Sequence, residues 1–104
     1  MKKETVYQTK LIKTLEKLLP GCFIMKNDPA ETQGIPDLLI LFRKRWAMLE
    51  TKASSKAPKQ PNQDYYVKKF GQMSFASFIN PQNEEQVLGD LQSALRVSRS
   101  SRLP

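Results

Sequence analysis

Two apolar runs separated by three basic residues place the strongest constraint on how this chain folds. The first run reads DLLILF (residues 37–42) and the second reads WAMLETK (residues 46–52), with RKR between them. Runs of this length, rich in branched and aromatic side chains and joined by a short polar segment, are typical of a β-hairpin. A hairpin is not stable on its own in water, so the pattern predicts a fold that is built around a larger sheet.

Helix and strand patterns fill most of the remaining sequence. Apolar residues recur at steps of three and four over residues 3–19, which predicts an amphipathic helix that Pro20 and Gly21 end. Two polar loops are predicted at residues 27–36 and 53–60, and turn-forming residues bound the other elements. The predicted strands lie at 22–26 and 74–79. One predicted helix covers 61–70, with Pro61 in its first turn and Gly71 as its stop, and the last helix is capped by Asn83 with Gln86 three residues on.

The predicted order of elements is α-β-β-β-α-β-α, which defines an α/β fold class. Because a helix lies between the third and fourth strands, these two strands are expected to be parallel and joined by a right-handed crossover. The sheet is then four-stranded and mixed, with helices flanking it. We expect a single domain over residues 1–97 and a flexible C-terminal tail over residues 98–104.

Charge and composition narrow the class of function. The 104 residues carry a formal net charge of +7, which favours nucleic acid as the partner through counterion release from phosphates, although a solvated basic surface is the alternative. The absence of histidine and the lone Cys22 exclude Cys/His zinc sites, His-based catalytic triads and an internal disulfide. No apolar run suits a membrane span or a signal peptide, so we expect an intracellular, cytoplasmic protein with no membrane partner.

Three charged residues of the predicted hairpin meet only in some strand registers. Residues two apart on a strand share a face, so Glu50 and Lys52 point to the same side. A two-residue turn at 44–45 would pair Asp37 with Lys52 and bring all three polar groups together. A three-residue turn that starts one residue earlier would send Asp37 to the opposite face. A shared site therefore requires a register in which the numbers of paired residues sum to an odd number.

Two carboxylates at this separation, those of Asp37 and Glu50, need a positive charge between them. Mg²⁺ takes one or two carboxylates, keeps several waters and accepts a phosphate oxygen, and it can lower the pKa of a bound water. Lys52 could orient or deprotonate that water, or neutralise developing charge. A turn aspartate and an exposed Glu50–Lys52 ladder are the alternatives, but the apolar WAML segment argues against exposure. The pattern predicts a Mg²⁺ site for phosphodiester chemistry, in which Mn²⁺ can substitute.

Pro36-Asp37, followed by Glu50-Thr51-Lys52, resembles the signature of the PD-(D/E)XK nuclease superfamily. The predicted order of elements is similar to the restriction-endonuclease-like core of that superfamily, αβββαβ(α). GIPDLLIL and the PNQ that opens the second helix look most like its VRR-NUC branch, which is found in phage and bacterial nucleases and is related to Holliday-junction resolvases. The resemblance implies metal ligation by Asp37, Glu50 and the backbone carbonyl of Thr51, and a catalytic role for Lys52.

A glutamate from the first helix often joins sites of this family, and Glu4 and Glu16 are the candidates. Position 4 lies in line with the apolar stripe of the helix, whereas position 16 lies about a third of a turn away, so Glu4 is the preferred catalytic residue. A glutamate that only complements the helix dipole is the alternative reading of Glu4. Gln63 matches a glutamine that the family carries near its site, with an ordinary polar helix start as the alternative.

Further polar residues near the predicted site are candidate DNA contacts. Lys56 and Lys59 follow the site in a Ser- and Pro-containing loop, and Lys26 and Asn27 lie at a strand end before the other long loop. With Gln63 they form the predicted DNA-binding set, although solvated loops are the alternative.

The resulting hypothesis is a Mg²⁺-dependent endodeoxyribonuclease that cuts branched, nicked or junction DNA by hydrolysing phosphodiester bonds. The resemblance implies a homodimer with a role in DNA recombination or repair, of a kind that phages encode and that acts in the host cytoplasm. A non-catalytic DNA-binding accessory protein on a nuclease-like scaffold is the alternative from another class. A nuclease module of a restriction or tRNA-processing system is a third, which would need a second domain for targeting.

Overall fold

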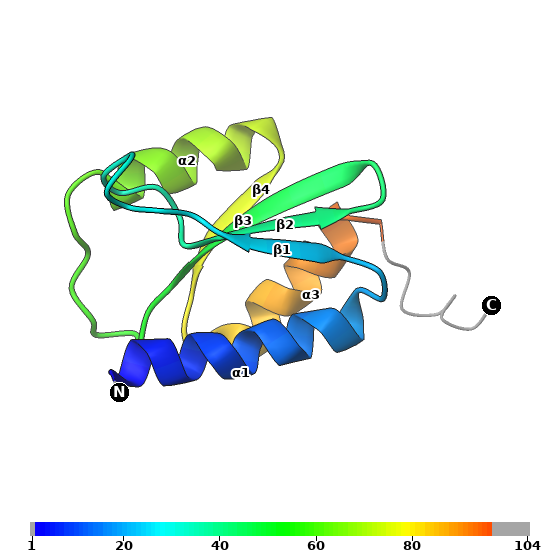
Figure 1. Ribbon diagram of the computed structural model, residues 1–104, viewed down its shortest axis with the longest axis horizontal. Coiled ribbons are helices and arrows are strands. Elements are labelled where there is room, and N and C mark those ends of the chain that lie inside the picture. The colour runs from blue at the N-terminus through cyan, green and yellow to red at the C-terminus, as the bar shows by residue number, and fades with distance from the viewer. Residues whose placement is uncertain (1, 97–104) are drawn as a thin grey trace.

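The computed structural model describes residues 2–96, so the predicted tail at 98–104 and the predicted domain limit at residue 97 lie outside the described residues. The elements are α1 (Lys3–Leu18), β1 (Phe23–Lys26), β2 (Leu38–Phe42), β3 (Arg45–Thr51), α2 (Gln63–Met73), β4 (Phe75–Ile79) and α3 (Glu84–Ala94) (Figure 1). Their order is the predicted order, which confirms the α/β fold class.

The four strands form one mixed sheet in the order β1-β2-β3-β4. β1 pairs with β2 and β2 with β3 in antiparallel fashion, whereas β3 and β4 are parallel. A parallel pair cannot be joined by a tight turn, and here α2 supplies the crossover. The predicted parallel pair and the four-stranded mixed sheet are therefore confirmed.

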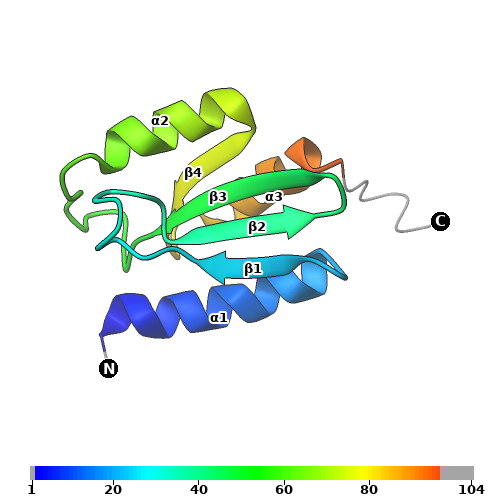
Figure 2. The same ribbon diagram turned by 45° about the horizontal axis from the view of Figure 1, so that its top comes forward.

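Helices cover the two faces of the sheet unequally. α1 and α3 lie on one face and α2 on the other (Figures 1 and 2). The core lies on the face of α1 and α3, and its buried residues come from both helices and from the strands between them: Leu11, Leu15, Leu19, Leu38, Ile40, Phe42, Ala47, Leu49, Ile79, Val87, Leu88, Leu91 and Leu95. Alternate residues of β2 and β3 point away from this core toward α2, which defines the face on which the site is built.

α2 covers only the β3–β4 half of its face. Its Phe70 packs edge-on against Trp46 at the start of β3, with ring centroids 6.2 Å apart, and stacks on Tyr66. The β1–β2 half of the same face has no helix over it (Figure 2). Phe23 pairs with Leu41 on that half, and the two side chains are 63% and 39% exposed.

Helix ends differ from the sequence predictions in three places. α2 runs through Gly71 to Met73, because Gly71 has helical backbone and is not among the described residues with positive φ. α2 also begins after Pro61, since Asn62 takes a left-handed conformation with φ 71°. The capping box of α3 is absent because Asn83 Oδ1 accepts the backbone N–H of Asn80 (2.8 Å) and Gln86 Nε2 bonds to Asp90.

None of the helices within residues 2–96 has the length and apolar character needed to cross a membrane.

Candidate active site

The hairpin register brings Asp37 and Glu50 to the same end of the sheet. Leu38 pairs with Leu49, so the backbone places Asp37 opposite Glu50. The paired residue numbers sum to 87, an odd number, as a shared site requires. The predicted pairing of Asp37 with Lys52 is wrong by two residues, because the turn falls at Arg43 and Lys44, with Arg43 at φ 57°. A shift by two keeps every side chain on its face, so the predicted convergence survives the error.

Hydrogen bonds from β3 hold the carboxylate of Asp37. Asp37 Oδ2 accepts the backbone N–H of Thr51 (3.0 Å) and its hydroxyl Oγ1–H (2.6 Å). The Thr51 hydroxyl oxygen in turn accepts Nε2–H of Gln8 on α1 (3.0 Å). This chain of contacts ties α1 to the hairpin and fixes one oxygen of Asp37, which leaves its other carboxylate oxygen for a ligand.

A buried amide lies between the charges of Glu50 and Lys52. Gln63, the first residue of α2, donates from Nε2 to Glu50 Oε2 (3.0 Å) and accepts Nζ–H of Lys52 at Oε1 (2.7 Å). Lys52 Nζ also donates to the carbonyl of Pro58 (3.0 Å). The exposed fractions of Glu50, Lys52 and Gln63 are only 2%, 6% and 9%. Gln63 therefore orients both groups and keeps them from forming a direct ion pair.

The carboxylate of Glu50 is buried without enough hydrogen-bond partners to offset its charge. Its Oε1 atom is buried and has no hydrogen-bond partner in the described structure. Burial, followed by the negative charge of Asp37, raises the pKa of Glu50 from 4.5 to about 8, and the charge of Lys52 opposes the shift. A buried carboxylate oxygen without a partner is costly when ionised. A cation at this oxygen would remove the cost, so the donor set of Asp37 and Glu50 fits a hard divalent metal.

Glu4 lies near these carboxylates, whereas Glu16 does not. Burial, followed by the charge of Asp37, raises the pKa of Glu4, and Lys52 and Lys2 oppose the shift. Glu16 instead acts on Cys22, beyond the other end of α1. Among residues 2–96 no three His, Cys, Asp or Glu side chains gather into a metal cage. The structure thus favours Glu4 over Glu16 as the neighbour of the site.

Thr51 contributes to the site through groups that the sequence did not single out. The resemblance implied that its backbone carbonyl ligates the metal, which stays a prediction, and the described contacts add its backbone N–H and its hydroxyl, both of which donate to Asp37. Gln8, its partner on α1, was missed altogether. Positions 4, 8, 11 and 15 share one helical face. Gln8 therefore lies between Glu4 and the buried Leu11, a signal that the sequence already contained.

The predicted DNA-binding residues separate into two groups. Lys26, Lys56 and Lys59 are exposed, and Lys59 forms an ion pair with Asp64 (2.9 Å). Asn27 instead braces the site, because its Nδ2–H bonds to the carbonyl of Pro36 (2.9 Å) and its backbone N–H to that of Asp37 (2.8 Å). Gln63 is buried between Glu50 and Lys52, so its first role is to position those two residues.

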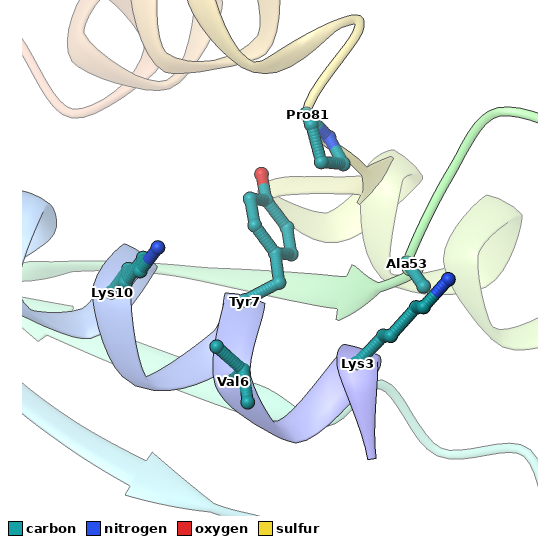
Figure 3. Close-up of a pocket in the computed structure, with 6 residues that line it drawn as sticks. All are labelled: Lys3, Val6, Tyr7, Lys10, Ala53 and Pro81. Atoms are coloured by element: carbon teal, nitrogen blue, oxygen red, sulfur yellow. The ribbon is translucent and has the colours of Figure 1, made fainter. Parts of the chain in front are cut away.

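A cavity of about 310 Å³ opens beside the site, between α1 and the segment after Lys52. It is lined by Lys3, Val6, Tyr7, Lys10, Ala53 and Pro81 (Figure 3). The hydroxyl of Tyr7 donates to Glu84 Oε1 (2.8 Å), which fixes the ring between the two lysines. Two lysines of α1 thus border the cavity, and Ala53 connects it along the chain to Lys52.

Comparisons of the chain with protein-family models, with curated proteins and with solved structures find no match.

Proposed function

We propose that this protein is a Mg²⁺-dependent endodeoxyribonuclease of the PD-(D/E)XK type. The observation that carries the proposal is a pair of adjacent carboxylates, one buried and one half-buried: Glu50, with an unpartnered Oε1, lies beside Asp37, whose second oxygen is not engaged by Thr51. A purely structural role for this pair is unfavourable, because burial penalises the charge of Glu50 and the like charge of Asp37 repels it. A bound divalent cation would reverse that balance and would supply Lewis acidity toward a phosphate and its attacking water.

Lys52 is positioned to neutralise charge that develops during phosphodiester cleavage. An ammonium group has three N–H donors, and two of them are used by Gln63 and the carbonyl of Pro58. The third is free to donate to a phosphate oxygen or to the attacking water. In a site this well buried, a fixed positive charge stabilises a developing anion more than it would in water.

Gln63 prepares the site for this chemistry. By accepting from Lys52 and donating to Glu50, it holds both side chains in one arrangement before a substrate arrives. Without the amide, Lys52 and Glu50 would be free to form a direct ion pair, which would mask both the ammonium and the metal-binding oxygen.

DNA as the substrate is supported by charge. A net charge of +7 on 104 residues favours a polyanion. The domain offers little surface for reading a long base sequence, so we propose selection by backbone and shape, as for branched or nicked DNA.

The test is cleavage of labelled four-way junction, nicked, duplex and single-stranded DNA in Mg²⁺, in Mn²⁺ and in chelator. Asp37→Asn and Glu50→Gln remove one ligand charge each, and Asp90→Asn is the matched control because Asp90 is exposed on α3. We expect metal-dependent cutting that survives in Asp90→Asn and is lost in the other two variants. Cutting that persists in Asp37→Asn, or in chelator, would rule out the proposed mechanism.

A non-catalytic DNA-binding protein on the same scaffold is the second candidate. It is favoured by one observation, the absence within residues 2–96 of a third carboxylate close enough to complete a metal cage. DNA binding without cutting under every metal condition would establish this function in place of the nuclease.

A further inference from the structure

Lysines form one continuous stripe along the outer face of α1. Lys3, Lys10, Lys13 and Lys17, with Val6 between the first two, follow one another at steps of three, four, three and four residues, and all five are exposed. This spacing places them on one side of the helix. The stripe is separate from the buried face of α1, which carries Leu11 and Leu15.

The charges of this stripe are not balanced inside the described structure. Within residues 2–96 the ion pair found is that of Lys59 with Asp64, and none involves α1. Glu4 turns toward the candidate site, and Glu16, which lies about a sixth of a turn from Lys13, forms no ion pair with it in the described structure. A row of like charges on a helix is destabilising by a few tenths of a kcal/mol per pair unless something outside the chain neutralises it.

The stripe begins at the end of α1 that carries Glu4. Lys3 adjoins Glu4, and Lys3 and Lys10 line the cavity of about 310 Å³ whose other wall includes Ala53, the residue after Lys52. Figure 3 shows the two lysines on either side of Tyr7, with Lys3 extending toward Ala53. From Lys3 to Lys17 the helix rises about 21 Å, which corresponds to about six phosphates of one DNA strand at 3.4 Å each.

We propose that the lysine stripe of α1 holds the sugar–phosphate backbone of the DNA on one side of the scissile phosphate, with the cavity at Lys3 and Lys10 taking the phosphate nearest the site. This inference rests on the proposed nuclease function. It assigns DNA contacts to a helix on which the sequence placed none, and it gives the substrate a direction, from the carboxylates toward the C-terminal end of α1.

The same stripe could in principle suit an anionic membrane, but the rest of α1 does not. Interfacial helices insert an apolar face into the lipid boundary. The apolar face of α1 is already used in the core, where Leu11 and Leu15 are 1% and 0% exposed. The exposed face of α1 therefore offers positive charge with little apolar surface, which suits a phosphate backbone rather than a lipid surface.

The experiment measures DNA binding in chelator, so that cleavage plays no part. The triple variant Lys10→Gln/Lys13→Gln/Lys17→Gln is compared with wild type and with the control Lys44→Gln/Lys68→Gln/Lys69→Gln, which removes the same charge from exposed positions elsewhere. Binding of fluorescein-labelled duplex and junction DNA is followed by anisotropy between 50 and 200 mM salt. Unchanged melting temperatures establish that each variant is folded.

Three lost phosphate contacts should reduce the slope of log affinity against log salt by about 2.7, at about 0.9 per contact. We expect that reduction in the α1 variant and a clearly smaller one in the control. Equal reductions in the two variants would show that only net charge matters and would overturn the proposed role of the lysine stripe. So would an unchanged slope in the α1 variant, or α1-dependent binding of vesicles containing anionic lipid with no effect on DNA.

The same set of proteins distinguishes failure of the DNA-binding role of the lysine stripe from failure of the nuclease function. Glu50→Gln is expected to abolish cutting while keeping the wild-type salt slope, because Glu50 touches no residue of the stripe. A wild-type protein that binds DNA through α1 but never cuts it would disprove the nuclease function and leave DNA binding by the lysine stripe standing.

Discussion

Replacing Glu50 with glutamine should make the metal-free protein more stable, by an amount that grows with pH. The wild-type side chain is buried with an unpartnered Oε1, and its raised pKa means that it folds in the protonated form over much of the neutral range. Glutamine has the same shape, is always neutral, and can still accept the hydrogen bond from Gln63 Nε2. The substitution therefore removes the cost of either protonating or burying the carboxylate.

The magnitude follows from the pKa of Glu50, which burial and the charge of Asp37 together raise from 4.5 to about 8. Between these two values the folded state binds more protons than the unfolded state, so stability falls as pH rises, at up to about 1.4 kcal/mol per pH unit. From pH 5 to pH 7 the wild type should lose about 2–3 kcal/mol relative to Glu50→Gln. For a domain of this size that difference corresponds to about 10 °C or more in Tm.

The assay is urea or thermal unfolding in chelator at pH 5, 6, 7 and 8, followed by the fluorescence of Trp46, the single tryptophan of the chain. Trp46 packs against Phe70 of α2, so its emission reports the folded sheet. Glu85→Gln is the control because Glu85 is exposed. Glu4 also has a raised pKa, but it is present in every protein compared and cancels.

Metal provides the second arm of this prediction. Mg²⁺ should stabilise the wild type more at pH 8 than at pH 6, because the ion competes with the proton on Glu50, and should have little effect on Glu50→Gln. A stability difference between wild type and Glu50→Gln that does not change with pH would refute the reasoning, since it would mean that Glu50 ionises in the folded protein as it does in water.

Three further substitutions test other parts of the structure. Lys52→Met should lower the cleavage rate about 10²–10³-fold, because it removes a fixed positive charge from the site. The pH midpoint of any residual cutting should rise, because Lys52 lowers the pKa of Glu50. An unchanged rate would exclude Lys52 from the chemistry. Gly34→Ala should cost about 1–3 kcal/mol for its positive φ of 89°, and more because its Cβ would lie 2.8 Å from the carbonyl oxygen of Pro61. Gly21→Ala is its control, with φ 88° and nothing within 4 Å, so equal losses in urea unfolding would show that the Pro61 contact is unimportant. Leu49→Ala, at a fully buried position, should cost about 2–5 kcal/mol in the same measurement; a loss below about 1 kcal/mol would contradict the described core.

Periodicity and turn chemistry were sufficient to predict the sheet. The two apolar runs joined by a short basic segment predict that β2 pairs with β3, and the position of α2 between β3 and β4 predicts which pair is parallel. The hairpin turn was misplaced because Arg43 takes a positive φ, which is uncommon for arginine and has no sequence signature. The error did not move any side chain to the other face, so Asp37 and Glu50 still converge.

The inner contacts of the site were beyond the reach of the sequence. Gln63 lies next to Glu50 and Lys52 only because α2 begins one residue after a left-handed Asn62, and that geometry depends on the packing of Gly34 against Asn62. Asn27 looked like a surface residue because its partners, the carbonyls of Pro36 and Asp37, are backbone groups that no side-chain pattern reveals. Local sequence signals predicted which residues gather at the site, whereas tertiary contacts determine the hydrogen-bond partners of each one.

The uncovered β1–β2 half of the sheet has a consequence for how copies of this protein behave toward one another. β1 is an edge strand of four residues, so its outer backbone groups are unpaired, and Phe23 and Met25 stand exposed beside them. Such an edge favours sheet-to-sheet pairing between molecules. The net charge of +7 opposes that pairing by mutual repulsion. Colloidal stability should therefore decline as salt screens the charge, and light scattering against salt concentration measures the decline directly.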